Sequence, residues 1–164
     1  APSRAGLALT GAALSWTAGA HLQARLAERV APGRLSATGA GCICLGILAM
    51  LPLLQPGTPI ALAFAAWSLA GFGMGIAYNT ATVSAMAATP EGAEGSTSTA
   101  LGMTDAVGIS LATGLGGALI AAADRGGNAT AEPLWIIWGV TAAVAAGAAL
   151  AARRLATRAA PDGR

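Results

Sequence analysis

The sequence predicts an all-α protein, a polytopic transmembrane helix bundle, and three observations carry this prediction. Long apolar stretches occupy most of the 164 residues. Hydrophobic residues make up 55% of the chain and charged residues only 10%, whereas a water-soluble domain carries about 25% charged residues. The arginines gather at one set of the ends of the apolar stretches, which is the positive-inside pattern of membrane proteins.

Five apolar stretches cover residues 5–23, 35–55, 59–88, 99–123 and 133–152. Each provides the roughly 20 residues that a helix rising about 1.5 Å per residue needs to cross about 30 Å of hydrocarbon. We therefore expect five membrane-spanning helices in one membrane region, residues 1–158, followed by a cytoplasmic tail at residues 159–164.

The connections explain where these helices end. The turn at residues 55–59 contains Pro56 and Pro59, which cannot continue a helix. The segment from Thr89 to Ser96 is acidic and flexible, and it separates the third and fourth helices. The third helix is longer than one span, so it tilts, extends into the cytoplasm or loosens near Tyr78. Short connections of this kind predict antiparallel neighbours.

Arginine positions set the expected orientation. Seven arginines lie after the first and fifth helices, whereas the opposite ends carry only Arg4 and Arg125. This asymmetry places the carboxy terminus in the cytoplasm and the start of the first helix outside, in the inner (plasma) membrane of a bacterial cell.

Trp135 and Trp138 start the fifth helix at the outer face, where aromatic residues anchor membrane helices. The chain opens without a leader segment, so we expect it to be the carboxy-terminal part of a longer protein.

Several function classes receive no support from the sequence. Cys42 and Cys44 are two residues apart on one helix, so their side chains diverge by about 200° and cannot share a metal. His21 has no companion at zinc-site spacing, and no phosphate loop, nucleophile elbow or catalytic triad is present. No basic patch interleaved with aromatic residues points to nucleic acid. We expect no metal, no cofactor and no enzymatic activity, and the bilayer as the partner of the apolar surface.

Polar residues distinguish the five helices, because an unpaired polar group in hydrocarbon costs several kcal/mol. The second and fifth helices are poor in polar groups and are expected at the periphery. The first, third and fourth are candidates for lining a path, and their aromatic and amide side chains are the candidate cavity residues Trp16, Trp67, Tyr78 and Asn79. Glycines predict close helix packing, at Gly71 and Gly75 in the third helix and at Gly108, Gly116 and Gly117 in the fourth.

The helix order, the arginine-rich loop after the first helix and the run GFGMGIAYN at residues 71–79 resemble the eighth to twelfth helices of a major facilitator superfamily transporter. The loop resembles that family's Gly-x-x-x-Asp-Arg-x-Gly-Arg-Arg motif, although Gln23 stands at the acidic position. The fourth helix carries a weak form of the drug/proton antiporter signature Gly-x-x-x-Gly-Pro-x-x-Gly-Gly, with Ala112 and Thr113 in place of Gly-Pro. The resemblance implies a fragment of a twelve-helix fold.

The resemblance also implies a function and roles for residues. It implies a secondary active transporter that works by alternating access, with proton-coupled efflux of small hydrophobic compounds, and with the missing amino-terminal half and a small-molecule substrate as partners. Arg25, Arg29 and Arg34 become candidates for a gating loop. Asp105 is the one acidic residue well inside a predicted span, and it becomes the candidate proton-coupling group.

Simpler alternatives stand beside each role. Asp105 can cap or pair within the protein near the cytoplasmic end of its helix, and the tryptophans can be packing residues. The glycine pairs can serve static packing alone. For the chain as a whole, the alternative to a transporter is a non-transporting integral membrane module, such as a sensor or an assembly subunit.

Overall fold

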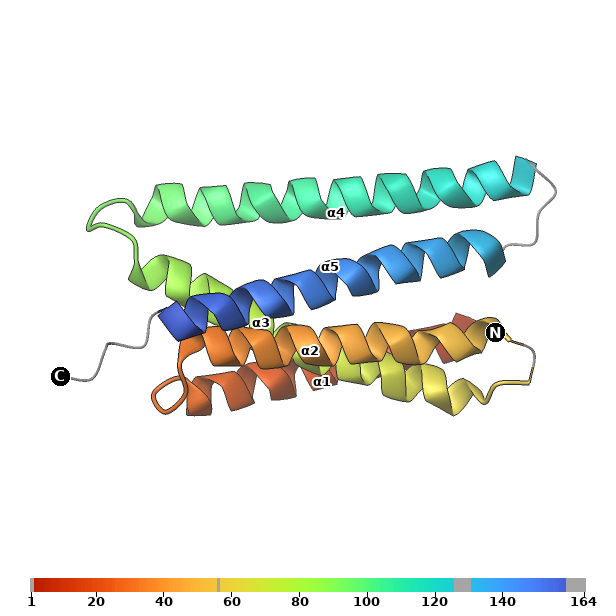
Figure 1. Ribbon diagram of the computed structural model, residues 1–164, viewed down its shortest axis with the longest axis horizontal. Coiled ribbons are helices and arrows are strands. Elements are labelled where there is room, and N and C mark those ends of the chain that lie inside the picture. Colours follow the sequence, from red (N-terminus) through yellow and green to blue (C-terminus); the bar gives the residue numbers. More distant parts are fainter. Residues whose placement is uncertain (1, 56, 126–130, 159–164) are drawn as a thin grey trace. The chain divides into compact units, whose positions relative to one another are not determined.

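A computed structural model of the chain describes residues 2–55, 57–125 and 131–158. It contains five α-helices and one short 3-10 helix, in the order α1 (Pro2–Leu26), α2 (Pro32–Met50), η1 (Leu51–Leu54), α3 (Ile60–Ala87), α4 (Glu94–Arg125) and α5 (Ala131–Arg158) (Figure 1). No strand occurs in these ranges. The predicted all-α class and the five helices are confirmed, and the predicted tail at 159–164 lies outside the described residues.

Three of the helical segments are long and apolar enough to cross a membrane, namely Pro32–Leu54, Ile60–Ala87 and Glu94–Ala122. Among the described side chains of α5, the apolar segment covers Trp135–Leu150. The structure thus shows three helices, α2, α3 and α4, with the length and apolar character that membrane crossing needs. That all five helices cross a membrane stays a prediction.

The predicted helix ends differ from the observed ones where a turn or a charged residue decides them. We predicted that the second helix runs to residue 55, but α2 ends at Met50 and continues as η1. Pro52 has no backbone N–H to offer and clashes with the preceding turn, so the chain tightens to the 3-10 form. The hydroxyl of Thr58 then donates to the carbonyls of Pro52 at 2.7 Å and Gln55 at 3.2 Å, and Gly57 adopts a φ of 88°.

The start of α4 also differs from the prediction, because Glu94 rather than Thr99 opens the helix. A carboxylate in the first turn interacts favourably with the helix dipole, and the Glu94 Oε1 atom accepts the backbone N–H of Gly92 at 3.2 Å. Gly92 itself turns the chain with a φ of 84°. Part of the segment predicted to be a flexible loop is therefore helix.

The ends of the first and fifth helices extend past the apolar stretches. Helix α1 runs to Leu26 and α5 runs through Arg153 and Arg154 to Arg158. Arginine is a good helix former, and basic side chains near a helix carboxy terminus complement the dipole. The hydropathy pattern therefore predicts the segment that fits the hydrocarbon layer, whereas the helix continues past the end of that segment.

Backbone contacts divide the chain into two compact units. Unit 1 comprises Ala1–Ala81 and Trp138–Arg164, and unit 2 comprises Thr82–Ile137. They subdivide the single membrane region expected for residues 1–158, and each is described by itself.

Small residues dominate the interior of unit 1. The buried hydrophobic side chains are mostly alanines, with Leu35 and Ile76 as the larger ones, and among the side chains that the structure describes no large one is fully buried. Large hydrophobic side chains instead point outward, for example Leu14 at 68% exposed and Leu45 at 59%. This inversion of the water-soluble arrangement is typical of helices that pack backbone to backbone and face lipid.

Within unit 2, a hydrogen bond ties the end of α3 to the start of α4. The Thr89 hydroxyl lies 3.0 Å from the Thr97 hydroxyl and donates to the Ala85 carbonyl at 2.8 Å. Ser96 adds a bond from its hydroxyl to the Ala93 carbonyl at 2.8 Å. These short-range bonds satisfy groups that the ends of two helices leave open.

Candidate ligand pocket

Helix α3 contacts α1 on one face and α2 on another, and its three central glycines make this possible. At 100° per residue, Gly71 and Gly75 fall on nearly one face of the helix, whereas Gly73 faces about 200° away. Accordingly, a Cβ on Gly71 would meet the Ala12 backbone of α1, and one on Gly75 would meet the Trp16 carbonyl. A Cβ on Gly73 would instead lie 2.8 Å from the Ile43 nitrogen of α2.

The partner helices meet α3 with small residues of their own. In α1, a Cβ on Gly19 would collide with the Phe72 carbonyl. In α2, a Cβ on Gly39 would lie 2.6 Å from the Ala77 nitrogen, and one on Gly46 would lie 2.7 Å from the Ala66 carbonyl. Helix backbones can approach this closely only where side chains are absent or minimal.

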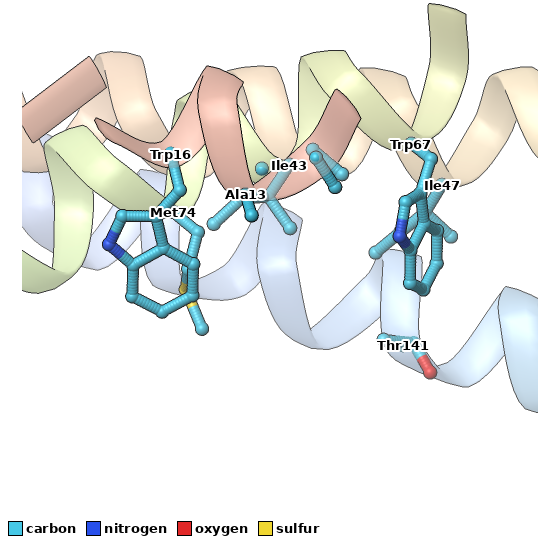
Figure 2. A pocket seen from close by; sticks show the side chains of 10 residues that line it. Ala13, Trp16, Ile43, Ile47, Trp67, Met74 and Thr141 are labelled. Atoms are coloured by element: carbon cyan, nitrogen blue, oxygen red, sulfur yellow. The ribbon is translucent and has the colours of Figure 1, made fainter. Parts of the chain in front are cut away.

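A pocket of about 480 Å³ lies beside this three-helix contact, and α5 contributes to its wall. All of its lining residues belong to unit 1, and they are Ala12, Ala13, Trp16, Ile43, Ile47, Trp67, Ala70, Gly71, Met74 and Thr141. The thiol of Cys44 in α2 donates weakly to the Ala142 carbonyl in α5 at 3.6 Å, which holds these two helices together near the pocket. Figure 2 shows Trp16 and Met74 at one end, Trp67 at the other, and Ala13 and Ile43 between them.

The pocket lining carries no formal charge. Among its side chains only Trp16, Trp67 and Thr141 carry nitrogen or oxygen, and the rest are aliphatic or, at Met74, a thioether. A volume of about 480 Å³ falls in the range of sites that hold small organic molecules. Chemically, the pocket can bury apolar surface and stack aromatic rings.

Two of the four candidate cavity residues, Trp16 and Trp67, line the pocket directly. Tyr78 lies behind Trp16, with ring centroids 5.9 Å apart at an interplanar angle of 57°, which is a favourable tilted aromatic pair. Asn79 is only half-buried and donates from Nδ2 to the Gly75 carbonyl of its own helix at 2.7 Å. The structure thus groups Trp16, Trp67 and Tyr78 and leaves Asn79 with a local bond.

The remaining candidate residues lie elsewhere. Arg25, Arg29 and Arg34 are exposed around the connection between α1 and α2, and Gln23 at the acidic position of the family motif is buried at 5% exposed. Asp105 is half-buried in α4, which belongs to unit 2 at this position, and it has an interaction partner. No atom of unit 2 lies within 4 Å of a Cβ built on Gly108, Gly116 or Gly117, so their packing role stays a prediction.

Polar content did not identify every wall of the pocket. Ile43 and Ile47 of α2 and Thr141 of α5 line it, although both helices are expected at the periphery on polar content. The α3 wall is a stripe of Trp67, Ala70, Gly71 and Met74, spaced by three and four residues. This spacing is visible in the sequence, but the polar residues of α3 do not gather on one face, so no contrast between faces singles the stripe out.

The potential metal ligands of the described ranges are dispersed. No group of three or more His, Cys, Asp or Glu side chains is placed there to hold a metal ion. Cys42 and Cys44 are both free and half-buried. Comparison with protein-family models, with curated proteins and with solved structures gives no match.

Proposed function

We propose that this chain is the carboxy-terminal membrane region of a secondary active transporter of the major facilitator type, which exports small hydrophobic compounds. The observation that carries the proposal is the uncharged, tryptophan-lined pocket of about 480 Å³ in a chain with membrane-length apolar helices. Such a pocket suits a compound that partitions into the bilayer, because it replaces lipid contacts with equally apolar ones and adds ring stacking.

Alternating access supplies the transport step in this proposal. The chain corresponds to the eighth to twelfth helices of a twelve-helix fold, and the missing amino-terminal half completes the central cavity. The close contacts of α3 with α1 and α2 support a unit that moves as one body, because a packed backbone interface does not deform gradually. The inner (plasma) membrane and a cytoplasmic carboxy terminus follow from the arginine asymmetry.

Proton coupling is assigned to Asp105 in this proposal. It lies in the apolar segment Glu94–Ala122 of α4, where a carboxylate is costly unless it has a function or a partner. Export against a gradient needs an energy source, and a carboxylate that gains and loses a proton in each cycle provides the coupling.

The test is transport by the full-length protein in proteoliposomes. With an imposed pH gradient, we expect uphill movement of a neutral fluorescent compound such as N-phenylnaphthylamine, and we expect an uncoupler to abolish it. Empty liposomes and liposomes without a gradient serve as controls. If a folded protein produces no gradient-dependent movement, the transporter proposal fails. The same rigid packing of α1, α2 and α3 would then favour the alternative, a non-transporting membrane module such as a sensor or an assembly subunit.

A further inference from the structure

We propose that the pocket of unit 1 is a binding site for a neutral two-ring aromatic molecule that enters from the bilayer. All of its lining residues belong to unit 1, so binding there can be measured separately from transport.

The absence of charge determines which ligands are excluded. None of the lining side chains is acidic or basic, so an ionic ligand would lose its water and find no counter-charge. The indole faces attract a cation, but they return only part of the hydration that burial removes, so the uncharged lining disfavours cations as well as anions. A neutral molecule with a single weak acceptor, such as a ketone, meets only the indole N–H groups and the Thr141 side chain as polar neighbours.

The length of the pocket fits two rings. Along α3 the lining runs from Trp67 to Met74. These two residues are seven positions apart, which corresponds to roughly 10 Å of helix axis. Trp16 and Met74 mark one end and Trp67 the other, so each end offers a surface for an aromatic ring, and Ala13 and Ile43 border the space between them (Figure 2). Indole faces and thioethers both bind aromatic rings favourably.

Access from the bilayer is consistent with the exposure of the two tryptophans. Trp16 is 39% exposed and Trp67 is 44% exposed, so the pocket opens at the surface of unit 1. Ala13 is also exposed, on the same side of α1 as Trp16. A lipid-dissolved molecule therefore reaches the site without crossing water.

Benzophenone tests this proposal, because it is a neutral diaryl ketone and reacts under light with nearby C–H groups. The excited ketone takes a hydrogen atom from a carbon next to the Met74 sulfur, and the two carbon radicals then join into one C–C bond, which leaves a hydroxyl on the former ketone. The full-length protein in lipid nanodiscs is irradiated with benzophenone, and mass spectrometry locates the adducts.

We expect labelling at Met74 to saturate and to be displaced by diphenyl ether, a neutral relative without the ketone. Labelling at Met103, which does not line the pocket, should rise linearly and resist displacement. Two charged derivatives of benzophenone, the benzoylbenzoate anion and a benzoylbenzyl trimethylammonium cation, should label Met74 at least about tenfold less than benzophenone does. Ala13→Leu should reduce the saturable labelling, whereas Ala18→Leu, on a different face of the same helix, should not.

Other outcomes would overturn the proposal. Unsaturable labelling of Met74 that parallels Met103 would mean that lipid acyl chains fill the pocket. Equal labelling by the charged counterparts would show that the missing charge does not select ligands. If Ala13→Leu lowers the yield of folded protein, Trp67→Phe tests the same site, and an unchanged affinity for benzophenone in that variant would count against the pocket. Transport in proteoliposomes is measured separately, so its failure does not affect this result.

Discussion

At the residue scale, the position of a glycine, and not its mere presence, decides whether it contacts another helix. The chain contains 23 glycines, yet only some of those in helices touch another backbone. Gly39 in α2 lies against Ala77 and Gly73 of α3, whereas Gly41, two residues later, has nothing within 4 Å of an added Cβ. The two residues differ by about 200° around the helix, so they face opposite sides.

We predict that Gly39→Ala destabilises the protein by about 1–3 kcal/mol, because the new Cβ would overlap backbone atoms that cannot move independently. Gly41→Ala should leave stability unchanged or raise it by up to about 1 kcal/mol, since alanine is the better helix former. Thermal unfolding of the two variants in the same detergent measures the difference. Equal melting temperatures would contradict the close contact between α2 and α3.

Asp105 supports a second prediction at this scale. If it carries the coupling proton, Asp105→Asn in the full-length protein should abolish proton-driven uphill transport while substrate binding and downhill exchange persist, because asparagine keeps the shape but takes up no proton. Asp124→Asn lies beyond the apolar segment of the same helix and serves as the matched control. Uphill transport at the parental rate in Asp105→Asn would move the coupling group elsewhere.

At the element scale, the helices are longer than their apolar segments, and local chemistry decides where they begin. Helix α4 starts at Glu94 because Gly92 allows the turn and the Glu94 carboxylate accepts a backbone N–H. The backbone N–H of Thr97 then bonds to the Ala93 carbonyl at 3.0 Å and completes the first turn. Helix starts of this kind add stability independently of the membrane.

We predict that Gly92→Ala weakens the start of α4 by about 1–2 kcal/mol, because an L-residue with a Cβ is strained at a φ of 84°. Hydrogen exchange of the Thr97 amide should become roughly 5- to 30-fold faster. Gly95→Ala lies in the first turn with open space around it, and it should slow the exchange or leave it unchanged. Faster exchange in both variants would mean that helix propensity, and not the turn, controls this end.

At the scale of the whole molecule, the exposed apolar side chains are compatible with a bilayer. In unit 1 alone Leu9, Leu14, Leu45, Val140 and Val144 are each at least 59% exposed. Apolar side chains exposed in this number are a liability in water and an advantage in hydrocarbon. In a bilayer, we expect the basic residues at the helix ends to select one of the two possible orientations.

A cysteine-accessibility experiment tests this topology. After Cys42 and Cys44 are replaced by alanine, a cysteine at the exposed position Gln55 should react with an impermeant thiol reagent in intact cells. Cysteines at the exposed positions Arg29 and Glu91 should react only after the cells are permeabilised. The inverted pattern would reverse the orientation, and reaction at all three positions in intact cells would argue against a membrane-spanning bundle.

The sequence by itself determined the class of this protein. Uninterrupted apolar runs specify helices because hydrocarbon leaves backbone groups no partner except their own helix, so the five segments could be placed to within a few residues. The aromatic candidates Trp16 and Trp67 could also be named, because large amphipathic rings are distinctive in such helices. The predicted helix segments are wrong at ends such as Met50 and Glu94, where Pro52 or a charged side chain acts over one turn.

Only the tertiary structure decided which faces meet. In a helix such as α3 the polar residues do not gather on one face, so the pattern cannot show that Gly71 and Gly75 contact α1 while Gly73 contacts α2. The pocket draws on four helices, and its walls at Ile43 and Thr141 depend on how α2 and α5 pack. Composition indicates which solvent each residue prefers, and this preference belongs to the residue alone. A pocket depends on where residues distant in the sequence lie relative to one another, and only the packing of the helices determines that.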